Sequence, residues 1–252
     1  MDEAIKKRYW IIFGTITLLL IADQWLKIWI KTHLQIGDEI PLIGDWCKLL
    51  FVENEGMAWG FSFGGVAGKY ILSTFRLVAS GVLLYIIVRM IKHSRPWLSL
   101  ICIALIFTGA VGNLIDSCFY GLVFDDSYYQ IADFVPWGTG YAPFLQGRVV
   151  DMFYFPLIDS YWPQWVPFVG GKHLEFFNAV FNIADACITV GVIVLLIHYL
   201  LLSNEKKEEA VTTTANAAVN SSDEIDATSA ANTSATQEQS QISQYGTETD
   251  NK

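Results

Sequence analysis

Four long apolar runs constrain the fold of this chain more than any other feature of its sequence. They cover residues 9–30, 70–91, 97–120 and 177–202. Each holds about 20 mainly apolar residues, the length that a helix needs to cross a hydrocarbon core of roughly 30 Å. The sequence therefore predicts an all-α membrane protein with four transmembrane helices.

Basic residues beside these runs predict their orientation. Three bases occupy residues 6–8 before the first run, and Lys92, His93 and Arg95 separate the second run from the third. By the positive-inside rule both segments face the cytoplasm, and so do both termini. The first run follows bases as a signal peptide does, but it lacks a small-residue cleavage site, so we expect an uncleaved span.

The two segments that then face outward, about 31–69 and 121–176, are rich in Trp, Tyr, Gly and Pro. Such residues are typical of structure at a membrane interface. KLLFVEN (48–54) has the composition of a strand. We therefore expect a small extracytoplasmic β-sheet and loops at the outer membrane surface.

The C-terminal tail differs in composition from the rest of the chain. From Asn204 onward it carries nine acidic and three basic residues, so it accounts for −6 of the net charge of −9. It is rich in Ser, Thr, Asn, Ala and Gln, which cannot bury enough apolar surface to offset the entropy of ordering. We expect a four-span membrane domain over 1–203 and a disordered, acidic cytoplasmic tail over 204–252.

Six polar residues from distant parts of the chain share one membrane depth in this topology. They lie within the outer half of their spans or at the outer surface: Asp23, Asn54, Asn113, Asp116, Asp151 and Asp185. A carboxylate inside a bilayer costs a few kcal/mol or more, and such residues usually have a function. One shared site is the simplest explanation.

Structural explanations exist for several of these residues. Asp23 could pair with Lys27 one helical turn later, and Asn113 and Asp116 could cap a helix end. Asn182 could join two helices by hydrogen bonds. Asp185 has no base one turn away. Four acids of the outward segments are expected to be solvated charges only: Asp125, Asp126, Asp133 and Asp159.

Two carboxylates brought close together tend to share one proton, which lets one act as a general base and the other as a general acid. This is the chemistry of aspartic proteases. The four histidines are scattered without metal-ligand spacing, so we expect no metal and no cofactor. GGVAGK (64–69) does not meet the spacing of a phosphate-binding loop, and no basic patch suggests nucleic acid.

Other functions remain open from the residues alone. A small transporter could use its aspartates to relay protons or bind a cation, but it would need ionisable groups through the whole membrane depth. A structural membrane subunit would leave Asp185 without a use. The four cysteines show no metal spacing, and a Cys47–Cys118 disulfide is conceivable outside the membrane.

Five motifs, in order, resemble those of the lipoprotein signal peptidase family, the bacterial signal peptidase II. They are IADQWLK (21–27), VENEGMAWGF (52–61), GAVGNLID (109–116), VVDMF (149–153) and FNIADACITVG (181–191). The resemblance covers about residues 9–202. Each motif alone is weak, but the five in this order on four spans are specific.

The resemblance implies that Asp151 and Asp185 are the catalytic pair. Asp23 and Lys27 match the first-span motif, with a more structural role. The positions that line the site, bind substrate backbone or hold the pair are Asn54, Asn113, Asp116 and Asn182.

The family cleaves the signal peptide of a prolipoprotein before a cysteine that carries diacylglycerol, needs no metal, and is inhibited by globomycin. The implied location is the bacterial cytoplasmic (inner) membrane, with the active site toward the outer leaflet. The expected partners are the diacylglyceryl-prolipoprotein and membrane lipid, and we expect a monomer.

The chain departs from the family pattern at Ser117, where arginine usually follows the third motif. We hypothesise that Arg148 replaces this arginine as the cationic contact to substrate. The outer segments 119–147 and 157–176 are longer than usual and rich in aromatics, and they could form a flap or extra interfacial surface.

Overall fold

Four helices long and apolar enough to cross a membrane confirm the predicted spans. They are α1 (Glu3–His33), α2 (Gly65–Lys92), a segment formed by α3 and its continuation (Trp97–Val123), and the helix Ile183–Leu202. The structure is a computed structural model that describes residues 2–55, 65–156, 158–176 and 179–202. The predicted tail over 204–252, and residues 56–61 of the second motif, lie outside these ranges.

The third span ends in an irregular turn. Helix α3 (Trp97–Ile115) continues into a π-helical turn, η2 (Asp116–Tyr120), and then into the short helix α4 (Gly121–Val123). π-Helical turns are rare and often lie at functional sites. Here the turn begins at Asp116, one of the residues predicted for the site.

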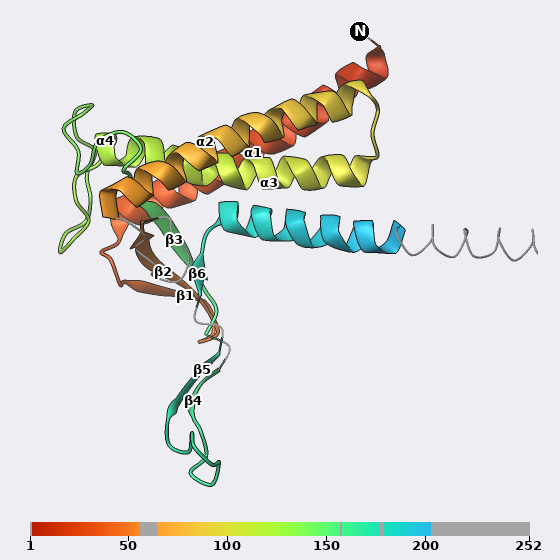
Figure 1. Ribbon diagram of the computed structural model, residues 1–252. Helices are drawn as coiled ribbons and strands as arrows, with labels where there is room; N and C mark the ends of the chain where they lie inside the picture. The colour runs from red at the N-terminus through yellow and green to blue at the C-terminus, as the bar shows by residue number, and fades with distance from the viewer. Residues whose placement is uncertain (1, 56–64, 157, 177–178, 203–252) are drawn as a thin grey trace, which may run out of the picture. The chain divides into compact units, whose positions relative to one another are not determined.

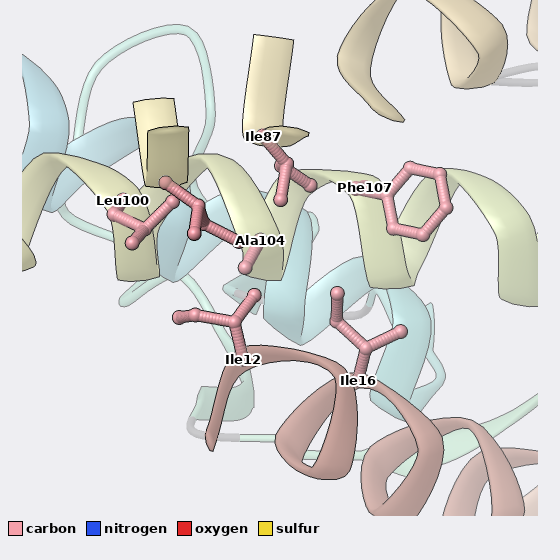
Figure 2. Close-up of a cluster of buried hydrophobic side chains, with 7 residues drawn as sticks. Ile12, Ile16, Ile87, Leu100, Ala104 and Phe107 are labelled. Carbon is pink, nitrogen blue, oxygen red and sulfur yellow. The ribbon is translucent and has the colours of Figure 1, made fainter. Parts of the chain in front are cut away.

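Helices α1, α2 and α3 pack on one another through an apolar cluster (Figure 2). Its buried members come from all three helices: Ile12 and Ile16 from α1, Ile87 and Ile91 from α2, and Leu100, Ala104 and Phe107 from α3. The loop between α2 and α3 is short, and Pro96 directly precedes α3. This packing fixes the three helices as a frame for the polar residues farther along them.

A four-stranded antiparallel sheet has the order β1-β2-β3-β6 (Figure 1). Its strands are β1 (Glu39–Ile43), β2 (Cys47–Asn54), β3 (Val149–Tyr154) and β6 (Val180–Phe181). The strand predicted over 48–54 is therefore confirmed. β6 directly precedes the fourth helix, which explains why that helix begins at Ile183 rather than at 177.

The pairing of β2 with β3 is irregular near the centre of the sheet. Leu49 pairs with Phe153 but Val52 pairs with Asp151, so one extra residue of β2 is accommodated there. Such a bulge bends a strand and redirects its side chains. Asn54 pairs with Val149 two rows beyond Asp151, on the same strand pair.

The sheet packs on the end of α1 and on the turn after α3 through a second apolar cluster. Its buried members are Ile30, Leu49, Phe51, Tyr120, Phe124, Val150 and Met152. β3 contacts both α1 and η2. The backbone of β3, and with it Asp151, is thereby held against the polar stretch of α1 and α3.

The two outer insertions have different structures. Residues 124–148 form loops joined by one β-bridge between Phe124 and Phe134, and the segment 158–176 forms a hairpin of β4 (Ile158–Tyr161) and β5 (His173–Phe176). Trp165 and Phe168, between β4 and β5, are almost fully exposed. The four cysteines are all buried free thiols, so Cys47 and Cys118 do not pair.

Candidate active site

Asp151 is a buried carboxylate on β3, with a hydrogen bond to each of its oxygens. Oδ1 accepts from Nδ2 of Asn182 at 2.7 Å, and Oδ2 accepts from Nδ2 of Asn54. Burial raises the pKa of Asp151 from 3.8 to about 7, and the charge of Asp185 adds to this effect. Lys27 and the bond from Asn182 act in the opposite direction but are weaker. Near neutral pH this carboxyl group can therefore hold or release a proton.

Asn182 connects the start of the fourth helix to the sheet. Its side-chain oxygen accepts from the backbone N–H of Asp185 at 2.9 Å, in the manner of a helix N-cap. Besides its bond to Asp151, its amide nitrogen donates to Oδ1 of Asn113 at 3.1 Å and to the carbonyl oxygen of Val150 at 3.2 Å. The residue is fully buried. Its predicted roles as a positioning residue and as interhelical glue both fit these contacts.

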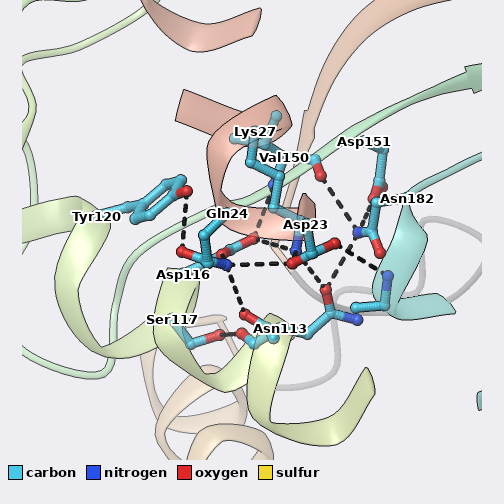
Figure 3. A network of polar contacts seen from close by, with 12 residues as sticks. Asp23, Gln24, Lys27, Asn113, Asp116, Ser117, Tyr120, Val150, Asp151 and Asn182 are labelled. Atoms are coloured by element: carbon cyan, nitrogen blue, oxygen red, sulfur yellow. Dashed lines mark hydrogen bonds and ion pairs between the residues drawn. The ribbon is translucent and has the colours of Figure 1, made fainter. Parts of the chain in front are cut away.

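Asp185 lies half-buried on the first turn of the fourth helix. Its Oδ1 accepts from Nδ2 of Asn113 at 2.7 Å, and Oδ1 of Asn113 accepts from Nζ of Lys27 at 2.9 Å. Asn113 and Asn182 thus join the two aspartates through amide groups, and the charge of Asp185 acts on Asp151. Figure 3 shows the part of this network from Asn113 through Asn182 to Asp151. The structure brings Asp151 and Asp185 into one network, as predicted.

Lys27 is a fully buried ammonium with two carboxylate partners. Its Nζ lies 3.0 Å from Asp23 and 2.8 Å from Asp116. The predicted pairing of Asp23 with Lys27 is confirmed, but it is one half of a triad. A buried charge is tolerated when it is paired and hydrogen-bonded. Oδ1 of Asp23 also accepts from the backbone N–H of Ala184 at 3.0 Å, which fastens the start of the fourth helix to α1.

Helix α3 ends at Asp116, as the structural explanation expects, but the side chain of Asp116 makes further contacts. It is completely buried, and its Oδ2 accepts from the backbone N–H of Val150 at 3.3 Å as well as from Lys27. Val150 directly precedes Asp151 on β3. Asp116 therefore links the third span to the backbone next to the aspartate pair.

Gln24 belongs to this network and was not among the predicted site residues. Its Nε2 contacts Asp23 at 3.2 Å, Asp116 at 2.9 Å and the carbonyl of Gly112 at 3.2 Å, and its Oε1 accepts from the hydroxyl of Tyr120. The sequence feature that could have identified Gln24 is its polar amide side chain, which directly follows Asp23 within an apolar run.

Close backbone contact positions Asp185. A Cβ atom on Gly109 would lie 2.1 Å from the carbonyl oxygen of Ala184, and one on Gly112 would lie 2.9 Å from Oδ2 of Asp23. Small residues let membrane helices approach this closely. The glycines of the motif GAVGNLID therefore allow α3 to meet the fourth helix next to Asp185.

Arg148 lies in a second polar cluster, together with Glu53 and Asp126. Nη1 of Arg148 contacts Glu53 at 2.8 Å and Asp126 at 3.0 Å, and Glu53 also pairs with the buried Lys31. Arg148 lowers the pKa of Asp126, chiefly by its hydrogen bonds. Asp126 is therefore an ion-pair partner rather than only a solvated charge, and the hypothesis that Arg148 replaces the missing arginine stays a prediction.

Arg76 is a cation beside the site and was not among the predicted site residues. It extends from α2, and its Nη1 donates to Oγ of Ser117 at 3.3 Å. Ser117 in turn donates to the backbone carbonyl of Asn113 at 3.0 Å. The signal in the sequence was an arginine within an apolar run, which is costly in a membrane.

An apolar groove of about 380 Å³ is lined by residues close in sequence to both aspartates. Its lining residues come from α3, β3, β6, the fourth helix and the residue after β3: Leu105, Phe153, Phe155, Phe181, Ile183, Ala186, Cys187 and Val190. Phe153 lies two residues after Asp151, and Ala186 directly follows Asp185. A polar pair beside an apolar groove suits a substrate with both a peptide bond and a hydrocarbon part.

This arrangement can perform general acid–base hydrolysis of a peptide bond. One protonated and one ionised carboxylate, both hydrogen-bonded, are what the aspartic mechanism requires. Across the described part of the chain, no three His, Cys, Asp or Glu side chains group together so as to hold a metal ion.

In comparisons with known proteins, a sequence-family model and individual relatives match this chain over most of its length. A sequence model of a family described as signal peptidase (SPase) II matches residues 15–201. A lipoprotein signal peptidase of Porphyromonas gingivalis is 45% identical over 188 residues, which cover 73% of this chain and 80% of that protein. One of Amoebophilus asiaticus is 35% identical and covers 76% of this chain and 78% of that protein. A solved structure described as a bacterial membrane enzyme has a TM-score of 0.52 and 26% identity, over 77% of this chain and 90% of that one.

Proposed function

Since the chain belongs to the signal peptidase II family of aspartic peptidases, we propose that Asp151 and Asp185 are the catalytic pair of this bacterial membrane protein. The enzyme is an intramembrane endopeptidase that removes the signal peptide from diacylglyceryl-modified prolipoproteins, before the lipidated cysteine. The transporter alternative has no support from the relatives. The observation that carries the assignment of the pair is the amide network of Asn113 and Asn182, which holds one oxygen of each aspartate.

The two aspartates have different surroundings, which suggests their roles. Asp151 is buried and its pKa lies at about 7, so it carries the shared proton. Asp185 is half-buried and lies at the start of the fourth helix, and in this proposal it takes a proton from the attacking water. Asp151 gives its proton to the carbonyl oxygen of the scissile bond, and a tetrahedral diol forms. Collapse of the diol, with proton transfer to the leaving nitrogen, releases the signal peptide.

The residues around the pair hold it in place. Asn54 donates to Asp151, and Asn182 fixes both Asp151 and the start of the fourth helix. Asp116 and Lys27 tie α3, β3 and α1 together behind the pair. In this proposal Asn54, Asn182, Asp116 and Lys27 position the aspartate pair, and Asp23, which pairs with Lys27, helps to position it too.

The site lies in the outer leaflet of the bacterial cytoplasmic membrane, with both termini in the cytoplasm and the sheet at the outer surface. Basic residues near the N-terminus and between α2 and α3 support this orientation. A substrate anchored by diacylglycerol presents its scissile bond at this depth. The apolar groove beside the pair offers a place for its hydrocarbon part.

The same proposal covers the remaining properties. The peptidase works as a monomer without a metal or cofactor, membrane lipid surrounds it, and globomycin inhibits it. The peptidase domain covers residues 1–203, and the segment 204–252 is a separate cytoplasmic tail.

The deciding experiment is cleavage of a diacylglyceryl-prolipoprotein by purified protein. Asp151→Asn and Asp185→Asn should each lower the rate by about a thousandfold or more, because neither variant can complete both proton transfers. Asp45→Asn, an exposed residue between β1 and β2, is the matched control and should cleave normally. Full cleavage by both site variants would refute the assignment.

A further inference from the structure

A small polar pocket lies at the end of α2, where the chain turns toward α3. It has a volume of about 250 Å³, and its lining residues are Tyr85, Ile86, Arg89, Met90, His93 and Arg95. Nη1 of Arg8 on α1 donates to the backbone carbonyl of Arg95 at 2.6 Å, so this end of α2 lies beside the start of α1 (Figure 1). Because the span formed by α2 ends at Lys92, the pocket lies at the level where lipid head groups begin.

A tight backbone turn directs Arg95 back onto the last turn of α2. The N–H of Ser94 donates to the carbonyl of Ile91 at 3.1 Å, and the N–H of Arg95 donates to the carbonyl of Met90 at 3.0 Å. These two bonds form a Schellman motif, which requires a positive φ at the position of Ser94. Ser94 has a φ of 48°, a conformation that costs serine more than glycine. The turn thereby brings Arg95 into the wall of the same pocket as Arg89.

Hydrogen bonds within α2 orient the other polar groups of the pocket. Nη1 of Arg89 donates to the hydroxyl of Tyr85 at 3.0 Å, and the guanidinium carbon lies 5.9 Å from the centroid of that ring. Nδ1 of His93 lies 2.8 Å from the carbonyl oxygen of Arg89. Since a carbonyl oxygen can only accept, this nitrogen carries a hydrogen. The remaining guanidinium donors of Arg89 and Arg95 can then contact a ligand in the pocket.

The pocket has a strongly positive charge. The sequence has no Asp or Glu between Glu55 and Asp116. Among the described residues, no ion pair includes Arg89 or Arg95. Arg8 adds a third guanidinium next to the pocket. Arginine binds phosphate oxygens through paired N–H···O bonds, so the pocket suits a phosphate group.

The orientation of the spans does not by itself explain this arrangement. The positive-inside rule needs only that basic residues lie near the membrane on one side. It requires neither a guanidinium held by Tyr85 nor a turn that folds Arg95 back beside it. Ile86 and Met90 supply apolar walls next to these cations. Cations beside apolar walls at the end of a span match a lipid, whose phosphate adjoins its hydrocarbon chains.

We propose that this pocket binds the headgroup phosphate of an anionic membrane phospholipid. Arg89 and Arg95 contact the phosphate oxygens, and the adjoining part of the lipid packs on Ile86 and Met90. The inference goes beyond the proposed function, because it uses none of the residues of the aspartate site and does not depend on cleavage.

The test measures lipid binding to the purified full chain in detergent by native mass spectrometry. The probes are phosphatidylglycerol, which is anionic, and phosphatidylcholine with the same acyl chains, which is zwitterionic. The test variant is Arg89→Gln/Arg95→Gln. The matched control is Lys6→Gln/Lys7→Gln, which removes two positive charges from the exposed start of α1, outside the pocket.

The wild type should bind phosphatidylglycerol at least about tenfold more tightly than phosphatidylcholine, because basic residues near the membrane surface attract anionic lipids. The arginine double variant should lose most of this preference, and the lysine control should keep it. Phosphatidylglycerol should also raise the melting temperature of the wild type but not that of the double variant.

Tyr85→Phe separates an ordered pocket from net charge. It keeps every cation but removes the hydroxyl that holds the guanidinium of Arg89. The preference for phosphatidylglycerol should therefore fall by about two- to threefold. Melting temperatures of all variants in phosphatidylcholine alone identify any folding defect.

Three results would overturn the inference. Equal binding of the two lipids by the wild type would show that the head group is not selected. Equal losses in the arginine and lysine double variants would show a diffuse charge effect instead of a site. If inorganic phosphate without lipid stabilised the wild type as much as phosphatidylglycerol does, the pocket would take a free anion. Asp151→Asn should bind phosphatidylglycerol like the wild type, so the outcome for cleavage is read separately.

Discussion

At the scale of single residues, Asp151 couples the pH to the stability of the fold. Its pKa rises from 3.8 to about 7 on folding, so between these values the folded protein binds a proton that the unfolded chain has released. Stability must then fall as the pH rises through this window. The contribution is at most about 4 kcal/mol.

We therefore expect the apparent melting temperature to fall between about pH 4 and pH 7, and to fall less in Asp151→Asn. Thermal unfolding in detergent at several pH values measures this. Asp45→Asn, which removes an exposed carboxylate, should follow the wild type. The same slope in Asp151→Asn and in the wild type would contradict the pKa of Asp151.

The individual site residues were predictable where one span carries both partners or where a motif fixes the position. Asp23 and Lys27 lie one helical turn apart, so their pairing follows from the helix alone. Arg76 and Ser117 lie on different helices, 41 residues apart, and their contact depends on how α2 and α3 pack. The role of Arg148 as a cationic contact to substrate stays a prediction, and its own contacts to Glu53 and Asp126 also depend on tertiary packing.

At the scale of elements, the contact of α3 with the fourth helix depends on Gly109. We expect Gly109→Ala to lower both the melting temperature and the cleavage rate, because its Cβ would lie 2.1 Å from the carbonyl oxygen of Ala184. Overpacking of this kind costs about 1–3 kcal/mol, and relief requires moving the turn that carries Asp185.

The matched control for this prediction is Gly81→Ala. Gly81 lies within α2, and a Cβ there would meet no atom within 4 Å. This substitution should leave cleavage unchanged and should not lower stability, since alanine favours a helix. If both alanine variants behaved alike, the close approach at Gly109 would have no role in positioning Asp185.

The elements themselves were predictable to different degrees. Hydropathy alone located four spans, and the composition of 48–54 identified β2. The π-helical turn η2 and the two-residue strand β6 were not predicted. Both depend on tertiary contacts: η2 carries the buried Asp116, and β6 exists only by pairing with β3.

At the scale of the whole molecule, the proposed orientation can be tested by labelling. All four native cysteines are buried, so we expect them to react little with a maleimide, and labelling then reports on an introduced cysteine. In spheroplasts, Asp45→Cys between β1 and β2 should react with a membrane-impermeant maleimide, whereas His93→Cys after α2 should react only after lysis. The reverse pattern would invert the topology and move the aspartates to the cytoplasmic half of the membrane.

The role of Asn182 has a consequence for drug resistance. The side chain of Asn182 caps the N-terminus of the fourth helix and donates hydrogen bonds to Asp151 and Asn113. A replacement at this position therefore damages the helix and the reaction together. An inhibitor whose polar groups bind the amide of Asn182 would leave a bacterium few ways to escape by mutation there. Compounds that bind the exposed hairpin β4–β5 would be more open to resistance, because substitutions there can weaken binding without disturbing the aspartate pair.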